Sequence, residues 1–280
     1  MTSDARMTST GHAVSDAPWL DLHFQTCRAE YEDALRFVGI EPGWTVLDAG
    51  CGSGGYIPLL GELVEPTGRV AALDLAPENV AQVERLVREG HCAASVDARV
   101  GSALDLPFAA ATFDCVWCAN VAQYLTEAEF TRVMGEFRRV TKPGGLVAAK
   151  DSDGTLLQLL PLDPAIMARQ VAARRAKAAE TGVLGAWCGS SLAQFFRQVG
   201  LTEIVRKGWL VERWSPISDH ARQFLAMGLR YHAKLAAEHD LSPADCEAYN
   251  AAAADPDRLF NDPDFCFREY FVVTIGHVPA

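Results

Sequence analysis

The sequence predicts a doubly wound α/β fold, with a mostly parallel sheet of seven strands, an N-terminal helix and helical insertions. Three observations lead to this prediction. Short apolar stretches alternate with helical stretches between residues 45 and 150, which favours parallel strands joined by right-handed crossovers. A glycine-rich segment directly follows the first apolar stretch. The chain has 280 residues, 49% of them hydrophobic, so it can bury one large core as a single domain with insertions.

Each element has its own signal. Apolar residues three and four apart in 17–38 predict an amphipathic N-terminal helix. Thr126 and Glu129 form a T-x-x-E capping box at the start of another helix, which the Lys-Pro-Gly-Gly segment at 142–145 ends. Strands are expected at 45–48, 69–75, 98–101, 113–119, 145–150, 203–211 and 269–278. The capping-box helix is expected at 127–140, and further helices are expected at 77–89, 165–180, 191–199, 218–238 and 243–253.

The charge balance and the hydropathy pattern argue against several classes of protein. There are 36 acidic and 25 basic residues, a net charge of −11, whereas a nucleic-acid enzyme normally needs a positive field. No apolar run approaches the roughly 18 residues of a membrane span. Residues 1–14 are polar and small, unlike a secretory signal. We therefore expect a flexible tail at 1–15 and a cytoplasmic monomer or homodimer without a nucleic-acid partner.

The eight cysteines follow no repeating spacing, so we expect free thiols rather than disulfides. The one close pair, Cys115 and Cys118, lies in an expected strand. Alternate residues of a strand point to opposite faces, so two residues three apart cannot share a face. No second pair of cysteines or histidines follows at zinc spacing. The sequence therefore predicts buried structural cysteines and no metal site.

A strand that ends in an acid and runs into glycines is the most informative motif. Residues 46–55 read Val-Leu-Asp-Ala-Gly-Cys-Gly-Ser-Gly-Gly. Glycines allow positive φ and a close approach of the backbone to a ligand. The Asp48 carboxylate would make no favourable interaction with the negative charge of a pyrophosphate, but it would bind an ammonium group. Asp74 ends the next strand, where a carboxylate can accept hydrogen bonds from both hydroxyls of a ribose.

The segment 48–54 resembles the D-x-G-x-G-x-G first motif of class I methyltransferases that use S-adenosylmethionine (SAM). The surrounding chain is similar to the quinone-biosynthesis and small-molecule branch of that family. The resemblance implies a Rossmann-like fold with SAM as cofactor and S-adenosylhomocysteine (SAH) as its product. The cofactor-binding residues that it implies are Asp48, Gly50, Cys51, Gly52, Gly54, Asp74, Leu75, Ser102, Ala103, Asn120 and Gln123.

Three further segments carry the resemblance through residues 45–150. The segment 101–108, Gly-Ser-Ala-Leu-Asp-Leu-Pro-Phe, is similar to the family's G-D-A-x-x-L-P-F segment beside the adenine. Ser102 replaces the usual acid there, so a weaker contact with the adenine amino group is expected. The segment 113–120 resembles the fourth motif, and 142–145 resembles the turn before strand five.

We divide the chain accordingly into four parts. They are a tail at 1–15, a cap helix at 16–40, a SAM-binding core at 41–150, and the rest of the sheet with helical insertions that form an acceptor pocket and lid at 151–280. The aromatic and apolar residues expected to line that pocket, with core packing as the alternative, are Trp209, Trp214, Phe224, Met227, Tyr231 and Phe260.

Candidate catalytic residues follow from where such a sheet binds its ligand. The sulfonium of SAM is an activated methyl donor, so alignment of the acceptor matters most and a base is optional. Residues just after the fourth and fifth strands face the ligand cleft. Tyr124, Asp151 and Asp153 are therefore candidates to orient or deprotonate the acceptor. His23, beside the apolar stripe of the N-terminal helix, is a fourth candidate, and each of the four has a structural role as its alternative.

These features predict transfer of the methyl group of SAM to an oxygen or nitrogen of an apolar or aromatic small molecule, a natural product or quinone-like metabolite. Three alternatives stay open. The acceptor atom can be carbon. An NAD(P)-dependent oxidoreductase would use Gly55 in a G-x-G-x-x-G register, but it would leave Asp48 and the Pro-Phe pair at 107–108 unexplained. A non-catalytic SAM-binding protein would keep the whole first motif.

Overall fold

The computed structural model describes residues 17–280, and the expected tail at 1–15 lies outside them. The strands are β1 (Thr45–Ala49), β2 (Arg69–Asp74), β3 (Ser95–Val100), β4 (Phe113–Ala119), β5 (Thr141–Ser152), β6 (Gln158–Leu160), β7 (Thr202–Trp214) and β8 (Cys266–His277). The α-helices are α1 (Ala17–Arg36), α2 (Ile57–Val64), α3 (Pro77–Arg88), α4 (Glu127–Val140), α5 (Pro164–Thr181), α6 (Ala193–Gln198), α7 (Asp219–Glu238), α8 (Pro243–Ala254) and α9 (Pro256–Phe260). Short 3-10 helices are η1 (Ala122–Tyr124), η2 (Gly154–Leu156) and η3 (Gly189–Ser191).

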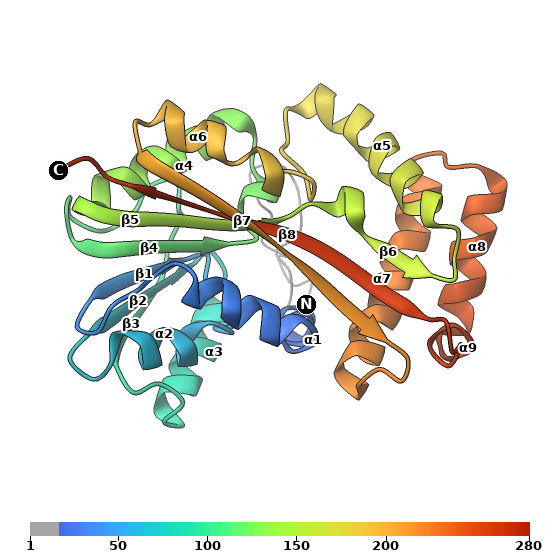
Figure 1. Ribbon diagram of the computed structural model, residues 1–280, viewed down its shortest axis with the longest axis horizontal. Helices are drawn as coiled ribbons and strands as arrows, with labels where there is room; N and C mark the ends of the chain where they lie inside the picture. The colour runs from blue at the N-terminus through green and yellow to red at the C-terminus, as the bar shows by residue number, and fades with distance from the viewer. Residues whose placement is uncertain (1–16) are drawn as a thin grey trace, which may run out of the picture.

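One mixed sheet organises these elements and confirms the predicted α/β fold (Figure 1). Its strand order is β3-β2-β1-β4-β5-β8-β6, and β7 pairs with the other edge of β8. The first five strands pair in parallel, whereas β8 is antiparallel to its three neighbours. The strand order reverses at β1, because β2 and β3 follow on one side of β1 and β4 and β5 follow on its other side. In an open α/β sheet such a switch point, at the carboxyl ends of the strands, is where a ligand binds.

The sheet differs from the predicted one at its antiparallel end. It contains eight strands in the described chain instead of seven, because β6 has only three residues and is too short to show an alternating pattern. The strands β7 and β8 are longer than expected and pair from Thr202 with His277 to Trp214 with Cys266. Figure 1 shows this long ribbon reaching from the sheet to the group formed by α5, α7, α8 and α9.

Two buried layers enclose the sheet. One packs α1, α2 and α7 onto the strands, and the other packs α4 and α6 onto the opposite face. Cys115 belongs to the first layer and Cys118 to the second, which confirms that the two thiols point to opposite faces. All eight cysteines are free thiols, as predicted. Among the helices of residues 17–280, none combines the length and the apolar character of a membrane span.

The helix α4 begins at the predicted capping box. The Thr126 hydroxyl accepts a hydrogen bond from the Glu129 N–H at 3.2 Å, and the Glu129 carboxylate accepts one from the Thr126 N–H at 2.9 Å. These two bonds satisfy donors that the first turn of a helix leaves unpaired. The bounds of α4 and β4 coincide with the predicted segments 127–140 and 113–119.

We predict that Thr126→Ala lowers the free energy of unfolding by about 0.5–2 kcal/mol, because the substitution removes the N-cap acceptor. Urea denaturation measures the effect. Thr131→Ala is the matched control, since Thr131 lies within the same helix and its exposed hydroxyl bonds only to the Glu127 carbonyl and to Gln198. Equal losses in the two variants would contradict the capping role.

Candidate functional site

The loop between β1 and α2 has a backbone that only glycine accommodates at several positions. Gly50 has φ +80° and Gly54 has φ +90°, both in the left-handed region. A Cβ at Gly50 would collide with the Val121 side chain after β4. The Gly50 and Cys51 N–H groups both donate to the Leu73 carbonyl of β2, at 2.7 and 3.0 Å. The loop is therefore held tightly across the switch point of the sheet.

Asp48 is a buried carboxylate that lacks a full set of partners. It is 1% exposed, and its Oδ2 has no hydrogen bond among the described residues. Burial, with a smaller contribution from the charge of Asp74, raises the pKa of Asp48 to about 8. The Tyr56 hydroxyl and the Trp117 Nε1 are likewise buried and without a hydrogen-bond partner in residues 17–280. Buried polar atoms without partners are costly, so this cluster is suited to a polar, cationic ligand.

Asp74 stands at the end of β2, as predicted, and its oxygens hold the surrounding backbone. They accept hydrogen bonds from the Gly52 N–H at 2.8 Å, the Ala76 N–H at 2.9 Å and the Asn79 amide at 3.1 Å. Asp74 thus supports both the glycine loop and the entry to α3. Leu75 beside it is 38% exposed, which leaves an apolar surface at the position expected for adenine.

The predicted adenine segment lies next to this edge. The Ser102 hydroxyl accepts a hydrogen bond from the Leu104 N–H at 3.2 Å, and Ala103 is half-buried. Asn120 follows β4 with φ +59°, and its Oδ1 accepts a hydrogen bond from the Lys150 ammonium at 2.9 Å. The Gln123 side chain donates to the Asn120 carbonyl at 3.3 Å. Ser102, Asn120 and Gln123 therefore already have local partners.

Asp151 and Asp153 have their oxygens engaged by neighbouring backbone and hydroxyl groups. Asp151 accepts hydrogen bonds from the Gln123 and Ser152 N–H groups, on the sheet face opposite Asp48. Burial raises the pKa of Asp151 to about 6 although the Lys150 charge opposes this. Asp153 accepts from Thr155 N–H and hydroxyl groups and from Ser190. Their catalytic role stays a prediction.

The helix α1 covers the glycine loop and brings His23 to the sheet. A Cβ added at Gly55 would collide with the Phe24 ring of α1, which shows how closely the helix approaches. His23 Nε2 lies 2.9 Å from Glu269 of β8, and the Tyr31 hydroxyl donates to the same carboxylate at 3.0 Å. His23 also stacks on Phe224 of α7, with 4.6 Å between the ring centroids.

The sequence analysis missed Lys150, Tyr31 and Glu269. Tyr31 lies eight residues after His23, on the same side of an amphipathic helix, and this spacing was the available signal. Glu269 had none, because 246 residues separate it from His23. His23, Cys27 and Glu269 also place one ligand atom each within 4.8 Å of one another, close enough for a metal ion. The catalytic candidate Tyr124 lies in η1, after β4.

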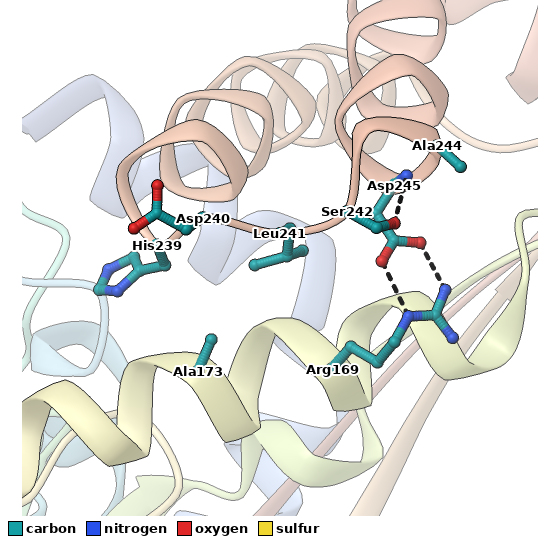
Figure 2. A pocket seen from close by; sticks show the side chains of 8 residues that line it. All are labelled: Arg169, Ala173, His239, Asp240, Leu241, Ser242, Ala244 and Asp245. Carbon is teal, nitrogen blue, oxygen red and sulfur yellow. Dashed lines mark hydrogen bonds and ion pairs between the residues drawn. The ribbon is translucent and has the colours of Figure 1, made fainter.

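A separate pocket lies between α5 and the turn from α7 to α8 (Figure 2). Its volume is about 420 Å³, and Arg169 and Asp245 form an ion pair at one end. Its lining residues are Arg169, Ala173, His239, Asp240, Leu241, Ser242, Ala244 and Asp245. None of them belongs to the carboxyl ends of β1, β2 or β4, so the pocket is distinct from the cluster around Asp48.

Comparison with known proteins agrees with the predicted resemblance. Residues 46–145 match a family model described as a methyltransferase domain. A demethylmenaquinone methyltransferase from Halalkalibacterium halodurans is 29% identical over 197 residues, which cover 65% of this chain and 78% of that protein. The comparisons confirm the predicted resemblance to SAM-dependent methyltransferases. The match of this chain to other demethylmenaquinone methyltransferases spans about half of their length.

Solved structures share the fold of this methyltransferase. One from Bacillus halodurans C-125, described as a methyltransferase, superposes with a TM-score of 0.54 at 16% identity, covering 89% of this chain and 98% of that one. The Haemonchus contortus phosphoethanolamine N-methyltransferase 2, solved with phosphomonomethylethanolamine and SAH, gives 0.54 at 16% identity and covers 95% of this chain and 61% of that one. At these identities the likeness concerns the fold alone.

We predict that Asp48→Asn weakens SAH binding about ten- to a hundredfold, because a hydrogen bond to a charged group contributes about 1.5–3 kcal/mol. Isothermal titration calorimetry measures the change. Asp97→Asn is the control, since this exposed carboxylate pairs only with Arg99 on β3. Unchanged affinity in the Asp48 variant would refute its contact with the ligand.

The same variant tests the pKa of Asp48. The folded protein keeps this carboxyl protonated up to about pH 8, whereas the unfolded chain releases the proton near pH 4. The stability from this group is therefore fully present below about pH 4 and is lost as the pH rises towards 8. Without ligand, Asp48→Asn should raise the free energy of unfolding at pH 8 by more than about 1 kcal/mol and change it little at pH 4. Denaturation curves showing the same effect at both pH values would disprove the assignment.

Proposed function

We propose that this methyltransferase transfers the methyl group of SAM to an oxygen or nitrogen of a small-molecule acceptor, a natural product or quinone-like metabolite. The observation that carries the proposal is Asp48, a buried carboxylate with an unpartnered oxygen beside the glycine loop. A carboxylate there complements the ammonium at the methionine end of SAM, and it would oppose the pyrophosphate of a dinucleotide.

The residues around Asp48 fit the cofactor. In this proposal Asp48 binds the ammonium, the glycines at 50–54 let the backbone approach the methionine end, and Asp74 and Leu75 hold the ribose and the adenine. The unpartnered Tyr56 hydroxyl supports the fit, because it offers a further hydrogen bond inside the same cluster. SAM supplies an already activated methyl group. The protein then has to orient the acceptor and exclude water.

An aromatic acceptor agrees with the rings that line this face of the sheet. The Tyr56 ring packs on Trp117 at 5.2 Å between centroids, and the Tyr31 ring packs on Phe271 at 5.1 Å. These rings are buried between β1, β4, β8 and α1, in the apolar layer on the Asp48 side of the sheet. The demethylmenaquinone methyltransferase name of the relatives points to the same class of acceptor.

His23 is the residue that we propose as proton acceptor where the acceptor molecule must lose a proton. It belongs to α1, on the same side of the sheet as Asp48, and the Glu269 carboxylate orients its imidazole ring. Asp151 and Asp153 are instead proposed to position η1, η2 and η3, since their oxygens accept hydrogen bonds from those segments. Tyr124 remains a candidate for ordering the acceptor.

A methyl-transfer assay tests the proposal. The purified protein is incubated with 13C-methyl SAM and a panel of hydroxylated naphthoquinones, phenols and amines, and 13C NMR assigns the methylated atom to oxygen, nitrogen or carbon. We expect transfer by the unmodified protein and, at SAM concentrations well below the weakened Kd, much slower transfer by Asp48→Asn. His23→Ala should lower kcat while SAH affinity stays unchanged. Folded protein that binds SAH but methylates nothing would indicate a non-catalytic SAM-binding protein, and binding of NADH in place of SAH would indicate an oxidoreductase.

A further inference from the structure

Lys150 is a buried cation at the carboxyl end of β5. It is 1% exposed. Its Nζ lies 3.6 Å from the centroid of the Tyr31 ring and 4.5 Å from that of Phe271. Within residues 17–280 its one hydrogen bond is to Asn120 Oδ1, at 2.9 Å. An ammonium carries three N–H groups, so two remain for a further acceptor.

The principal negative charge near Lys150 already has other partners. This charge is that of Glu269, and its carboxylate accepts hydrogen bonds from the Tyr31 hydroxyl and pairs with His23. Cys27 and Asp151 also act on Lys150 to raise its pKa, but burial outweighs all three and lowers the pKa of Lys150 to about 8. The side chain therefore still carries a positive charge at neutral pH.

The position of Lys150 in the sheet places it on the acceptor side of the site. The strands β1, β4 and β5 are neighbours and run in parallel, so their carboxyl ends form one edge. Asp48 lies near the end of β1, Asn120 follows β4, and Lys150 lies near the end of β5. Along this edge Lys150 lies two strands away from the carboxylate proposed to hold the methionine end. Lys150 and Asp48 also face the same buried layer, beneath α1.

A divalent metal ion at His23, Cys27 and Glu269 is the competing use of this region. Such an ion would lie beside two cations, because the charges of Lys150 and Arg213 are both close enough to act on the pKa of the Cys27 thiol, which they lower. It would also have to replace the hydrogen bonds of Glu269 with His23 and Tyr31. A singly charged organic anion would not be repelled by these cations and would leave the hydrogen bonds of Glu269 in place.

We propose that Lys150 binds the ionised hydroxyl oxygen of the acceptor, which makes the acceptor an aromatic or quinone-type molecule with an acidic hydroxyl group. The inference rests on the proposed function and narrows its acceptor class. A phenolate or enolate would accept the spare N–H groups of Lys150 and offset its buried charge. An amine in its cationic form would instead meet a second ammonium. Tyr31 belongs to α1, so a movement of this helix that admits SAM to Asp48 would also uncover Lys150.

The test compares 2-hydroxy-1,4-naphthoquinone with its 2-methoxy analogue, which has the same ring system but cannot ionise. Both are titrated by calorimetry into SAH-saturated protein. The hydroxy compound should bind at least about tenfold more tightly. Lys150→Met should weaken its binding about ten- to a hundredfold and leave the methoxy compound and SAH unaffected.

Two further variants keep the test decisive if Lys150→Met proves unstable. Glu269→Gln keeps the shape of the side chain and removes the charge that most raises the pKa of Lys150, so its preference for the hydroxy compound should be lost at a lower pH than in the unmodified protein. Lys150→Arg keeps the charge and should retain part of the preference. Lys234→Met is the matched control, because Lys234 is an exposed lysine of α7 that pairs only with Glu238. Thermal unfolding of every variant checks that it is folded.

Several outcomes would overturn the inference. Equal weakening of both quinones in Lys150→Met would show a merely structural lysine, and an unchanged pH dependence of binding in Glu269→Gln would contradict the charge argument. Failure of the SAH-bound protein to bind the hydroxy compound would exclude this acceptor class. Zinc that survives dialysis and is lost in Cys27→Ser would assign the region to a metal. Failure to bind SAH at all would contradict the proposed function instead.

Discussion

The burial of a carboxylate at the tip of a central strand is the constraint on which the site depends. The parallel strands β2 and β4 flank β1 and leave Asp48 almost no solvent, while no donor among residues 17–280 satisfies its second oxygen. Isolated carboxyl groups in such places respond by holding their proton. Binding of a cation beside Asp48, as proposed, would recover the free energy that the fold loses here.

The second feature of the site is its cover. Phe24 of α1 lies directly against the glycine loop, and the same helix supplies His23 and Tyr31 to Glu269. One helix therefore closes over the region around Asp48 and completes the polar network next to it. Both contacts belong to a single helix, so a displacement of α1 would expose the glycine loop and the surroundings of Lys150 together.

Local patterns accounted for most of the fold and for the glycine loop after β1. The capping box of Thr126 and Glu129, the strand at 113–119 and the run of glycines after Asp48 are each set by neighbours in sequence. Contacts between distant segments had no such signal. Glu269 meets His23 only because β8 returns beside β5 under α1, and the short β6 forms only because β8 offers it an edge.

The aromatic residues of the second half of the chain illustrate the same limit. Helical and strand periodicity identifies them as apolar, but it does not say which layer each one joins. Phe224 stacks on His23, whereas Trp214 and Tyr231 are about half exposed. Only the crossing of α1 and α7 decides that Phe224 reaches the network. Residues that come together through long-range packing are thus the part of the site that is hardest to predict from the sequence.

Lys150 and Asp151 are adjacent in β5, and their positions determine which of the two lies on the same face of the sheet as Asp48. Both are buried charged residues at the same strand end, and the sequence pointed to the acid because it directly follows the strand expected at 145–150, where residues should face the ligand cleft. In the sheet, Lys150 pairs opposite Val273 and faces α1, while Asp151 pairs opposite Val272 and faces η1. Successive side chains of a strand point to opposite faces, so only one of the two can share a face with Asp48. The register of β5 against β8 therefore places a cation, and not a carboxylate, on the face of the sheet that Asp48 shares.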